Sequence, residues 1–128
     1  MNFGKVKKIF IVDDDALMSE ALADYLLMQA PHTIHQFRTG EDCLKHIGDH
    51  PDIVILDYYL DAVDKTAANG MEILQTIKKY YPHTHVIMLS GQEKYAVAMQ
   101  SIQKGAEQYV LKGQDSFEKI ANLVKELE

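Results

Sequence analysis

The chain has 128 residues, a formal net charge of −6 and a single cysteine, which excludes an intrachain disulfide. This length is typical of one globular domain, and we expect residues 1–128 to form a single domain. The negative charge argues against direct nucleic-acid binding. No apolar stretch approaches the roughly 18 residues of a membrane span, and the first residues lack the apolar segment of a signal peptide. We therefore expect a cytoplasmic domain with no membrane contact.

Short apolar runs alternate with helical patterns along the whole chain. The predicted strands are Lys8–Val12, Thr33–Phe37, Asp52–Leu56, Val86–Leu89 and Gln108–Leu111. The predicted helices span about Ala16–Gln29, Glu41–Gly48, Met71–Tyr81 and Lys94–Lys104, and a fifth helix begins near Ser116. Periodicity and the residues that flank each segment support both sets. This alternation predicts an α/β fold, in which helices cover both faces of a parallel sheet.

Local patterns add three expectations. Asp15 directly precedes the first predicted helix and is a suitable N-cap. Cys43 lies near the start of the second helix, and we interpret it as a small core residue, because no activating His or Lys stands beside it in a known motif. The stretch Tyr58–Asn69 between a strand and a helix has about a dozen residues, where two to six are typical, and loops of that length are frequently functional.

Polar side chains follow four of the predicted strands. Asp13 and Asp14 follow the first strand, Asp57 the third, Ser90 the fourth and Lys112 the fifth. Taken singly, each residue has an ordinary interpretation as a helix cap, a turn residue or a solvated strand end. Because the carboxyl ends of parallel strands share one edge of the sheet, we expect all five side chains to converge on one pocket.

This set of residues indicates phosphoryl chemistry. Clustered carboxylates bind Mg²⁺, a cation that prefers a few oxygen ligands and keeps several waters. A carboxylate can also attack a phosphoryl group and form an aspartyl phosphate. Phosphoryl transfer requires positioning and charge neutralisation, which Mg²⁺ and Lys112 can supply, while Ser90 can donate a hydrogen bond to a phosphoryl oxygen.

The sequence resembles the receiver domain of two-component response regulators, the CheY-like family. The motifs that carry the resemblance are Ile11–Asp15, Pro51–Asp57, Asn69–Leu74, Leu89–Gly91 and Lys104–Lys112, and the resemblance covers about residues 7–127. It implies a flavodoxin-like, doubly wound (βα)5 fold with a five-stranded parallel sheet in the order 2-1-3-4-5.

The resemblance also implies roles for the acidic pocket. Asp57 matches the phosphoacceptor, and Lys112 matches the lysine that pairs with the acceptor or its phosphate. The Mg²⁺ site would comprise Asp14 as a direct ligand, Asp13 through water, Asp57 itself and the backbone carbonyl of Tyr59.

Four residues match positions that govern the switch and its lifetime. Ser90 matches the hydroxyl that responds to phosphorylation, and Tyr109 matches an aromatic ring that turns inward with it. Tyr59 and Gln92 occupy variable positions that can tune the lifetime of the phosphate, by shielding the site from water and by orienting water, respectively.

The sequence departs from the family pattern in two places. Asp61 stands where the family usually has proline, and the loop carries about five extra residues, which add Asp61 and Asp64. We interpret this as a solvated insertion, with a partial lid over the site as the alternative. Gly113 stands where proline usually follows Lys112, so we predict a trans Lys112–Gly113 bond, because a cis bond without proline costs about 2.5–4 kcal/mol.

The resemblance implies a phosphoacceptor signalling switch. A sensor histidine kinase or phosphotransfer protein would donate a phosphoryl group to Asp57, and an effector or output domain would read the resulting conformation. Such a domain catalyses only its own phosphorylation and dephosphorylation. The alternatives are a phosphorylation-independent pseudo-receiver and a true enzyme, either an aspartyl-nucleophile phosphatase or a flavin-binding protein. The pseudo-receiver would lack a residue of the pocket, and the phosphatase would have a cap domain, which this short chain lacks. The flavin protein would have a different phosphate loop.

Overall fold

The computed structural model describes residues 5–61 and 65–127. Its strands are β1 (Lys8–Val12), β2 (Thr33–Phe37), β3 (Ile53–Asp57), β4 (His85–Ser90) and β5 (Gln108–Leu111). Its helices are α1 (Ala16–Gln29), α2 (Gly40–His46), the 3₁₀ helix η1 (Ile47–Asp49), α3 (Gly70–Tyr80), α4 (Tyr95–Gln103) and α5 (Ser116–Glu126). The strands form one parallel sheet in the order β2-β1-β3-β4-β5, which confirms the predicted fold and topology.

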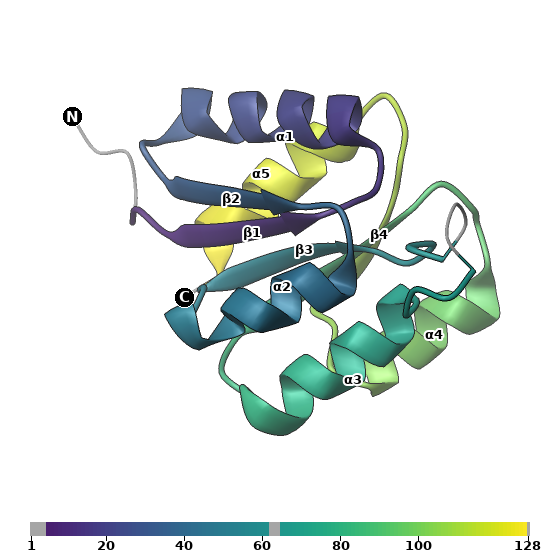
Figure 1. Ribbon diagram of the computed structural model, residues 1–128. Helices are drawn as coiled ribbons and strands as arrows, with labels where there is room; N and C mark the ends of the chain where they lie inside the picture. The colour runs from purple at the N-terminus through teal and green to yellow at the C-terminus, as the bar shows by residue number, and fades with distance from the viewer. Residues whose placement is uncertain (1–4, 62–64, 128) are drawn as a thin grey trace.

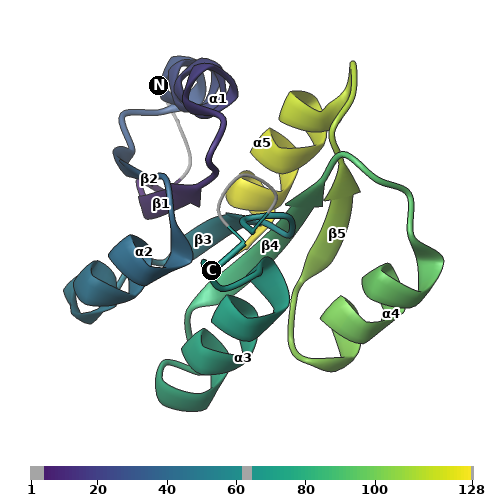
Figure 2. The same ribbon diagram turned by 45° about the vertical axis from the view of Figure 1, so that its right-hand side comes forward.

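Helices cover both faces of the sheet. Figures 1 and 2 show α1 and α5 on one face and α2, α3 and α4 on the other. Alternate residues of each central strand serve the two faces, so that Phe10 and Val12 pack toward α2 and α3, whereas Ile9 and Ile11 pack toward α1 and α5. All four side chains are fully buried. The apolar runs of β1, β3 and β4 therefore reflect burial on both faces, whereas the edge strands β2 and β5 are largely exposed.

Several boundaries differ from prediction by one or two residues, including the start of β3 and the start of α2. Asp52 lies outside β3, and its carboxylate accepts a hydrogen bond from the backbone N–H of Lys8 at 2.8 Å. α2 begins at Gly40, where an added Cβ would lie 2.2 Å from Cγ1 of Ile73 in α3. The absence of a side chain at Gly40 thus permits the close approach of the two helices.

Three local predictions are confirmed. Asp15 caps α1, because its carboxylate accepts a hydrogen bond from the N–H of Met18 at 3.1 Å. Cys43 is fully buried, and burial raises the pKa of its thiol to about 12, as expected of an unreactive core residue. The Lys112–Gly113 bond is trans, like every other peptide bond in the described segments.

Among the described residues, no helix has the length and apolar character needed to cross a membrane.

Candidate functional site

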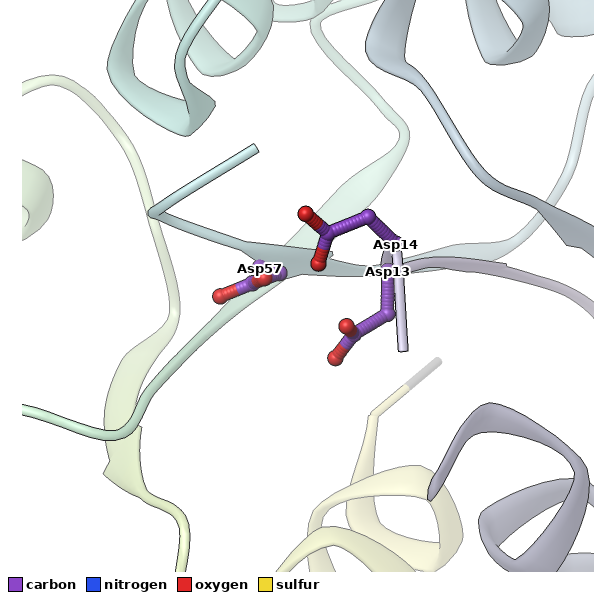
Figure 3. Close-up of side chains that lie close together, drawn as sticks. All are labelled: Asp13, Asp14 and Asp57. Carbon is purple, nitrogen blue, oxygen red and sulfur yellow. The ribbon is translucent and has the colours of Figure 1, made fainter. Parts of the chain in front are cut away.

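Three carboxylates gather at the carboxyl edge of the sheet. β1 and β3 are neighbours, with Val12 opposite Leu56, so the residues that end these strands lie side by side. Each of Asp13, Asp14 and Asp57 places a carboxylate oxygen within 4.8 Å of the other two. Figure 3 shows the three side chains around one common space. The convergence expected from the sequence is therefore present for the acidic residues.

The environment of Asp57 disfavours its charge. The side chain is only 4% exposed, and burial, followed by the negative charge of Asp13, raises the pKa of Asp57 to about 6. Lys112 and the backbone N–H of Tyr59, which lies 3.3 Å from Oδ1 of Asp57, act in the opposite direction. Burial and then Asp13 also raise the pKa of Asp14. The pocket holds more negative charge than its protein groups neutralise.

Lys112 joins this pocket from the end of β5. Its Nζ lies 3.0 Å from Oδ2 of Asp13 and 3.7 Å from Oδ1 of Asp57. Burial alone would lower the pKa of Lys112, but the hydrogen bond to Asp13 and the charge of Asp57 outweigh burial and raise it. Sequence reasoning expected Lys112 beside the acceptor and missed Asp13 as its nearer partner, because side-chain conformation decides between the two.

The chemistry of the oxygen atoms suits a divalent cation. Oδ2 of Asp14 is buried and has no hydrogen-bond partner among the described residues. Burial of such an atom lowers the stability of the fold unless a ligand or ion binds to it. A cavity of about 410 Å³ adjoins it and is lined by Asp14, Asp15, Asp57, Tyr59, Gly91, Gln92 and Lys112. Asp13 does not line this cavity, and its Oδ1 accepts the N–H of Asp15 at 2.9 Å.

Ser90 and Tyr109 meet at one backbone group. The buried Ser90 hydroxyl accepts a hydrogen bond from the Gln92 N–H at 3.1 Å and donates to the Gln92 carbonyl at 3.4 Å. The Tyr109 hydroxyl donates to the same carbonyl at 2.9 Å, and burial raises the pKa of Tyr109. Sequence reasoning assigned Gln92 a side-chain role. It missed this backbone role, because every residue type has a backbone carbonyl.

Comparison with known proteins decides the family. The sequence model of one protein family, the response regulator receiver domain, matches residues 9–125 of this chain. The chain belongs to this family. The receiver domain is 26% identical to the chemotaxis protein CheY of Bacillus subtilis over 106 residues, which cover 82% of this chain and 84% of CheY. It is 30% identical to the probable C4-dicarboxylate response regulator DctR of the same organism over 107 residues, 82% of this chain and 45% of DctR.

Longer relatives and solved structures complete the comparison. This receiver domain spans about half the length of several curated relatives, for example 49% of the response regulator VraR of Staphylococcus saprophyticus. It superposes on the BeF3-activated DrrB receiver domain with a TM-score of 0.78 and 29% identity, covering 94% of this chain and 96% of that one. A CheY-like receiver protein from Methanospirillum hungatei, 21% identical, has the same fold with a TM-score of 0.81, covering 94% and 93%.

The long loop of this receiver domain is anchored at both described ends. Leu60 is buried in the core beside α3, and the N–H of Gly70 donates to the carbonyl of Tyr58 at 2.8 Å. The N–H of Ala68 donates to Oε2 of Glu41 in α2 at 2.9 Å, a contact that sequence reasoning missed because the two residues are 27 positions apart.

Of the two acidic residues in the insertion, only Asp61 lies in the described part of the chain. Asp61 is half-buried and contributes, after burial and Tyr59, to a raised pKa of Tyr58. It does not belong to the three-carboxylate cluster. Asp64 lies outside the described residues. The lid hypothesis concerns a segment that includes residues 62–64, which also lie outside them.

Proposed function

We propose that this receiver domain is a phosphoacceptor switch in which Asp57 receives a phosphoryl group in a Mg²⁺-dependent reaction. The observation that supports this most directly is the arrangement at Asp57. Its buried carboxylate lies beside two further carboxylates and 3.7 Å from the Lys112 ammonium, next to an open cavity. This arrangement supports roles for Asp57 as acceptor, for the carboxylates as a cation site and for Lys112 as a neutralising charge toward one incoming group.

Asp14 and Asp57 would hold Mg²⁺ directly, together with the backbone carbonyl of Tyr59, and Asp13 would contribute through water. The unpartnered Oδ2 of Asp14 supports a direct contact, and the position of Asp13 outside the cavity supports an indirect one. When bound, the cation supplies positive charge to the phosphoryl oxygens. The set of hard oxygen donors fits this ion.

In the transfer step, a carboxylate oxygen of Asp57 attacks phosphorus and forms an O–P bond. The bond from phosphorus to the donor's histidine nitrogen breaks, and the electron pair returns to the imidazole. With a pKa of about 6, Asp57 is mostly ionised at neutral pH and able to attack. Lys112 neutralises charge on the transferred group, and a short movement from Asp13 brings its ammonium to a phosphoryl oxygen.

Ser90 and Tyr109 would convert the new bond into a conformational change. To donate to a phosphoryl oxygen, the Ser90 hydroxyl must leave the Gln92 carbonyl, which Tyr109 also uses as an acceptor. The phosphoryl group therefore favours one arrangement of the β4–α4 loop over another, and the domain responds by a population shift. Tyr59 and Gln92 line the cavity, where they can limit or orient attacking water and so set the rate of self-catalysed dephosphorylation.

The proposed donor is a sensor histidine kinase or a phosphotransfer protein in the cytoplasm, and the proposed reader is an effector or output domain. We assign no direct nucleic-acid contact to residues 1–128, which act as a single receiver unit. The pseudo-receiver alternative is not favoured, because Asp13, Asp14, Asp57, Ser90 and Lys112 are all in place.

Incubation with acetyl phosphate and Mg²⁺, followed by intact mass measurement, tests the proposal. The expected result is one hydroxylamine-sensitive phosphoryl group per chain, which is lost in Asp57→Asn and retained in the control Asp24→Asn on the exposed side of α1. Equal phosphorylation of Asp57→Asn would contradict the assignment of the acceptor. An unmodified wild-type protein would support the pseudo-receiver, and turnover of acetyl phosphate that persists in Asp57→Asn would indicate an enzyme with another nucleophile.

A further inference from the structure

A second group of buried polar residues lies at the opposite edge of the sheet from Asp57. Lys7 directly precedes β1, His32 directly precedes β2, and Val124 belongs to the last turn of α5. Figure 1 shows the beginnings of β1 and β2 and the end of α5 on the same side of the molecule. The exposed fractions of Lys7, His32 and Val124 are 3%, 9% and 2%. The proposed phosphoryl chemistry uses none of these residues.

Hydrogen bonds connect the three segments, and one of them joins the N–H of Thr33 to the Lys7 carbonyl at 3.0 Å. The backbone N–H of Lys7 donates to Nδ1 of His32 at 3.0 Å, and both groups are buried. The Lys7 ammonium donates to the Val124 carbonyl, one of the terminal carbonyls of α5. A cation at the carboxyl end of a helix also interacts favourably with the helix dipole. Lys7 thus joins the segment before β2 to the end of α5 through its backbone and its side chain.

The hydrogen bond from Lys7 to His32 exists in only one protonation state of His32. Nδ1 accepts a hydrogen bond, so the proton of the neutral ring must reside on Nε2. In the imidazolium form, Nδ1 becomes a donor and faces another donor, the Lys7 N–H. Lys7 is also the charged group that acts on His32, and its ammonium would then stand beside a second cation in a buried environment.

We infer that His32 is an acid-sensitive contact: in its neutral form it fixes Lys7 and the last turn of α5, and its protonation releases both. Burial, followed by the charge of Lys7, lowers the pKa of His32 below its ordinary value of 6.5. The unfolded chain therefore binds this proton more readily than the folded chain. The stabilising contribution of His32 is complete above about pH 6.5 and declines as the pH falls toward the lowered value.

The test must separate this effect from other groups that titrate in the same range. Asp57, at the opposite edge of the sheet, is one such group, with a pKa of about 6. His32→Asn is the informative variant, because Oδ1 of asparagine can replace Nδ1 as the acceptor and does not titrate. His83→Asn in the exposed turn before β4 is the matched control.

Nuclear magnetic resonance of the full chain measures the contact directly. In the wild type at about pH 7.5, we expect the His32 imidazole nitrogens to show the Nε2–H tautomer and the Lys7 amide to exchange slowly. At about pH 5, we expect the Lys7 amide to exchange roughly fivefold faster or more, after correction for the intrinsic rate, as expected for loss of one buried hydrogen bond. The acceleration should persist in His83→Asn and disappear in His32→Asn.

The wild-type measurements alone can overturn the inference, even where His32→Asn does not fold. An Nδ1–H tautomer at neutral pH would contradict it, and so would titration of His32 at or above 6.5. Equal protection of the Lys7 amide at both pH values would also contradict it. The same acid-induced acceleration in a folded His32→Asn protein would assign the effect to another group.

Discussion

At the scale of single residues, the candidate site depends on the position of one ammonium group. Lys112 lies closer to Asp13 than to Asp57, and it opposes the burial that raises the pKa of Asp57. The same ammonium group thus contacts two carboxylates of the site. Its effect on the chemistry and its effect on the charge of the acceptor can be measured separately.

Replacing Lys112 by methionine, which preserves much of the aliphatic length, removes that charge. We expect the rate of phosphorylation by acetyl phosphate to fall by about 10²-fold, as when one charge-stabilising group is removed from an active site. Intact mass measured over time gives the rate. Lys119→Met is the control, because Lys119 is exposed and pairs with Asp115 outside the pocket. A rate within about twofold of wild type would contradict the assigned role.

The raised pKa of Asp57 makes stability depend on pH. The folded state binds this proton more tightly than the unfolded state, whose value is 3.8 against about 6. Protonated Asp57 therefore favours folding, and this contribution disappears as the pH rises from about 4 to about 6, by at most about 3 kcal/mol. Urea unfolding of the metal-free protein across this range should show a decline that is absent in Asp57→Asn. If the free energy of unfolding depended on pH in the same way in both proteins, the raised pKa of Asp57 would be contradicted.

At the scale of elements, the start of α3 is constrained by the end of β3. An added Cβ at Gly70 would lie 2.5 Å from the carbonyl oxygen of Asp57 and 2.6 Å from Cα of Tyr58. These are backbone atoms, so a larger residue must displace the strand end that carries Asp57. Glycine here therefore sets the position of Asp57 as well as the path of the loop.

Gly70→Ala should consequently affect both stability and chemistry. We expect a loss of about 1–3 kcal/mol in the free energy of unfolding, as in other overpacked sites, together with slower phosphorylation of the protein that remains folded. Gly113→Ala is the matched control, because an added Cβ there meets nothing within 4 Å, and it should leave stability within about 1 kcal/mol. Denaturant unfolding and acetyl phosphate kinetics on both variants provide the measurement. Unchanged values for Gly70→Ala would contradict the constraint.

The elements themselves were predictable to within one or two residues. The central strands β1, β3 and β4 are apolar runs buried on both faces, and helical periodicity marks the helices. The topology followed from the resemblance. The boundary at Asp52 depends on a hydrogen bond to Lys8, a residue distant in sequence, whereas the start of α2 follows from Thr39, whose hydroxyl caps the N-terminus of the helix. The convergence of the acidic residues was predicted from strand ends, whereas the Lys112–Asp13 pair depends on rotamers that sequence patterns do not encode.

At the scale of the whole molecule, the site and the outer strand β5 are connected through Ser90, Gln92 and Tyr109. Neighbouring residues of β4 and β5 pair in register, with Met88 opposite Tyr109, and Lys112 N–H donates to the Ser90 carbonyl at 2.8 Å. A change at Ser90 therefore has a short route to the surface formed by β5 and α4. Tyr95 and Met99 on α4 are exposed and available there to a partner.

Ser90→Ala should separate phosphorylation from its structural consequence. With Mg²⁺ and beryllofluoride as a phosphoryl mimic, we expect amide shift changes in the wild type to extend from the pocket to Tyr109 and α4. In Ser90→Ala they should remain near Asp57, because the hydroxyl that links the group to the loop is absent. Ser90→Thr, which retains a hydroxyl, should restore the distant changes. Distant changes of wild-type size in Ser90→Ala would contradict the route.

The acceptor shared by Ser90 and Tyr109 is a peptide carbonyl, and every amino acid at position 92 supplies one. Substitution there changes a side chain that lines the cavity, while the carbonyl that accepts both hydroxyl groups is retained. In the proposed switch, a substitution at this position would therefore change the lifetime of the phosphate without removing this shared acceptor. A mutational scan of position 92 would consequently detect changes in decay rate and leave the coupling undetected.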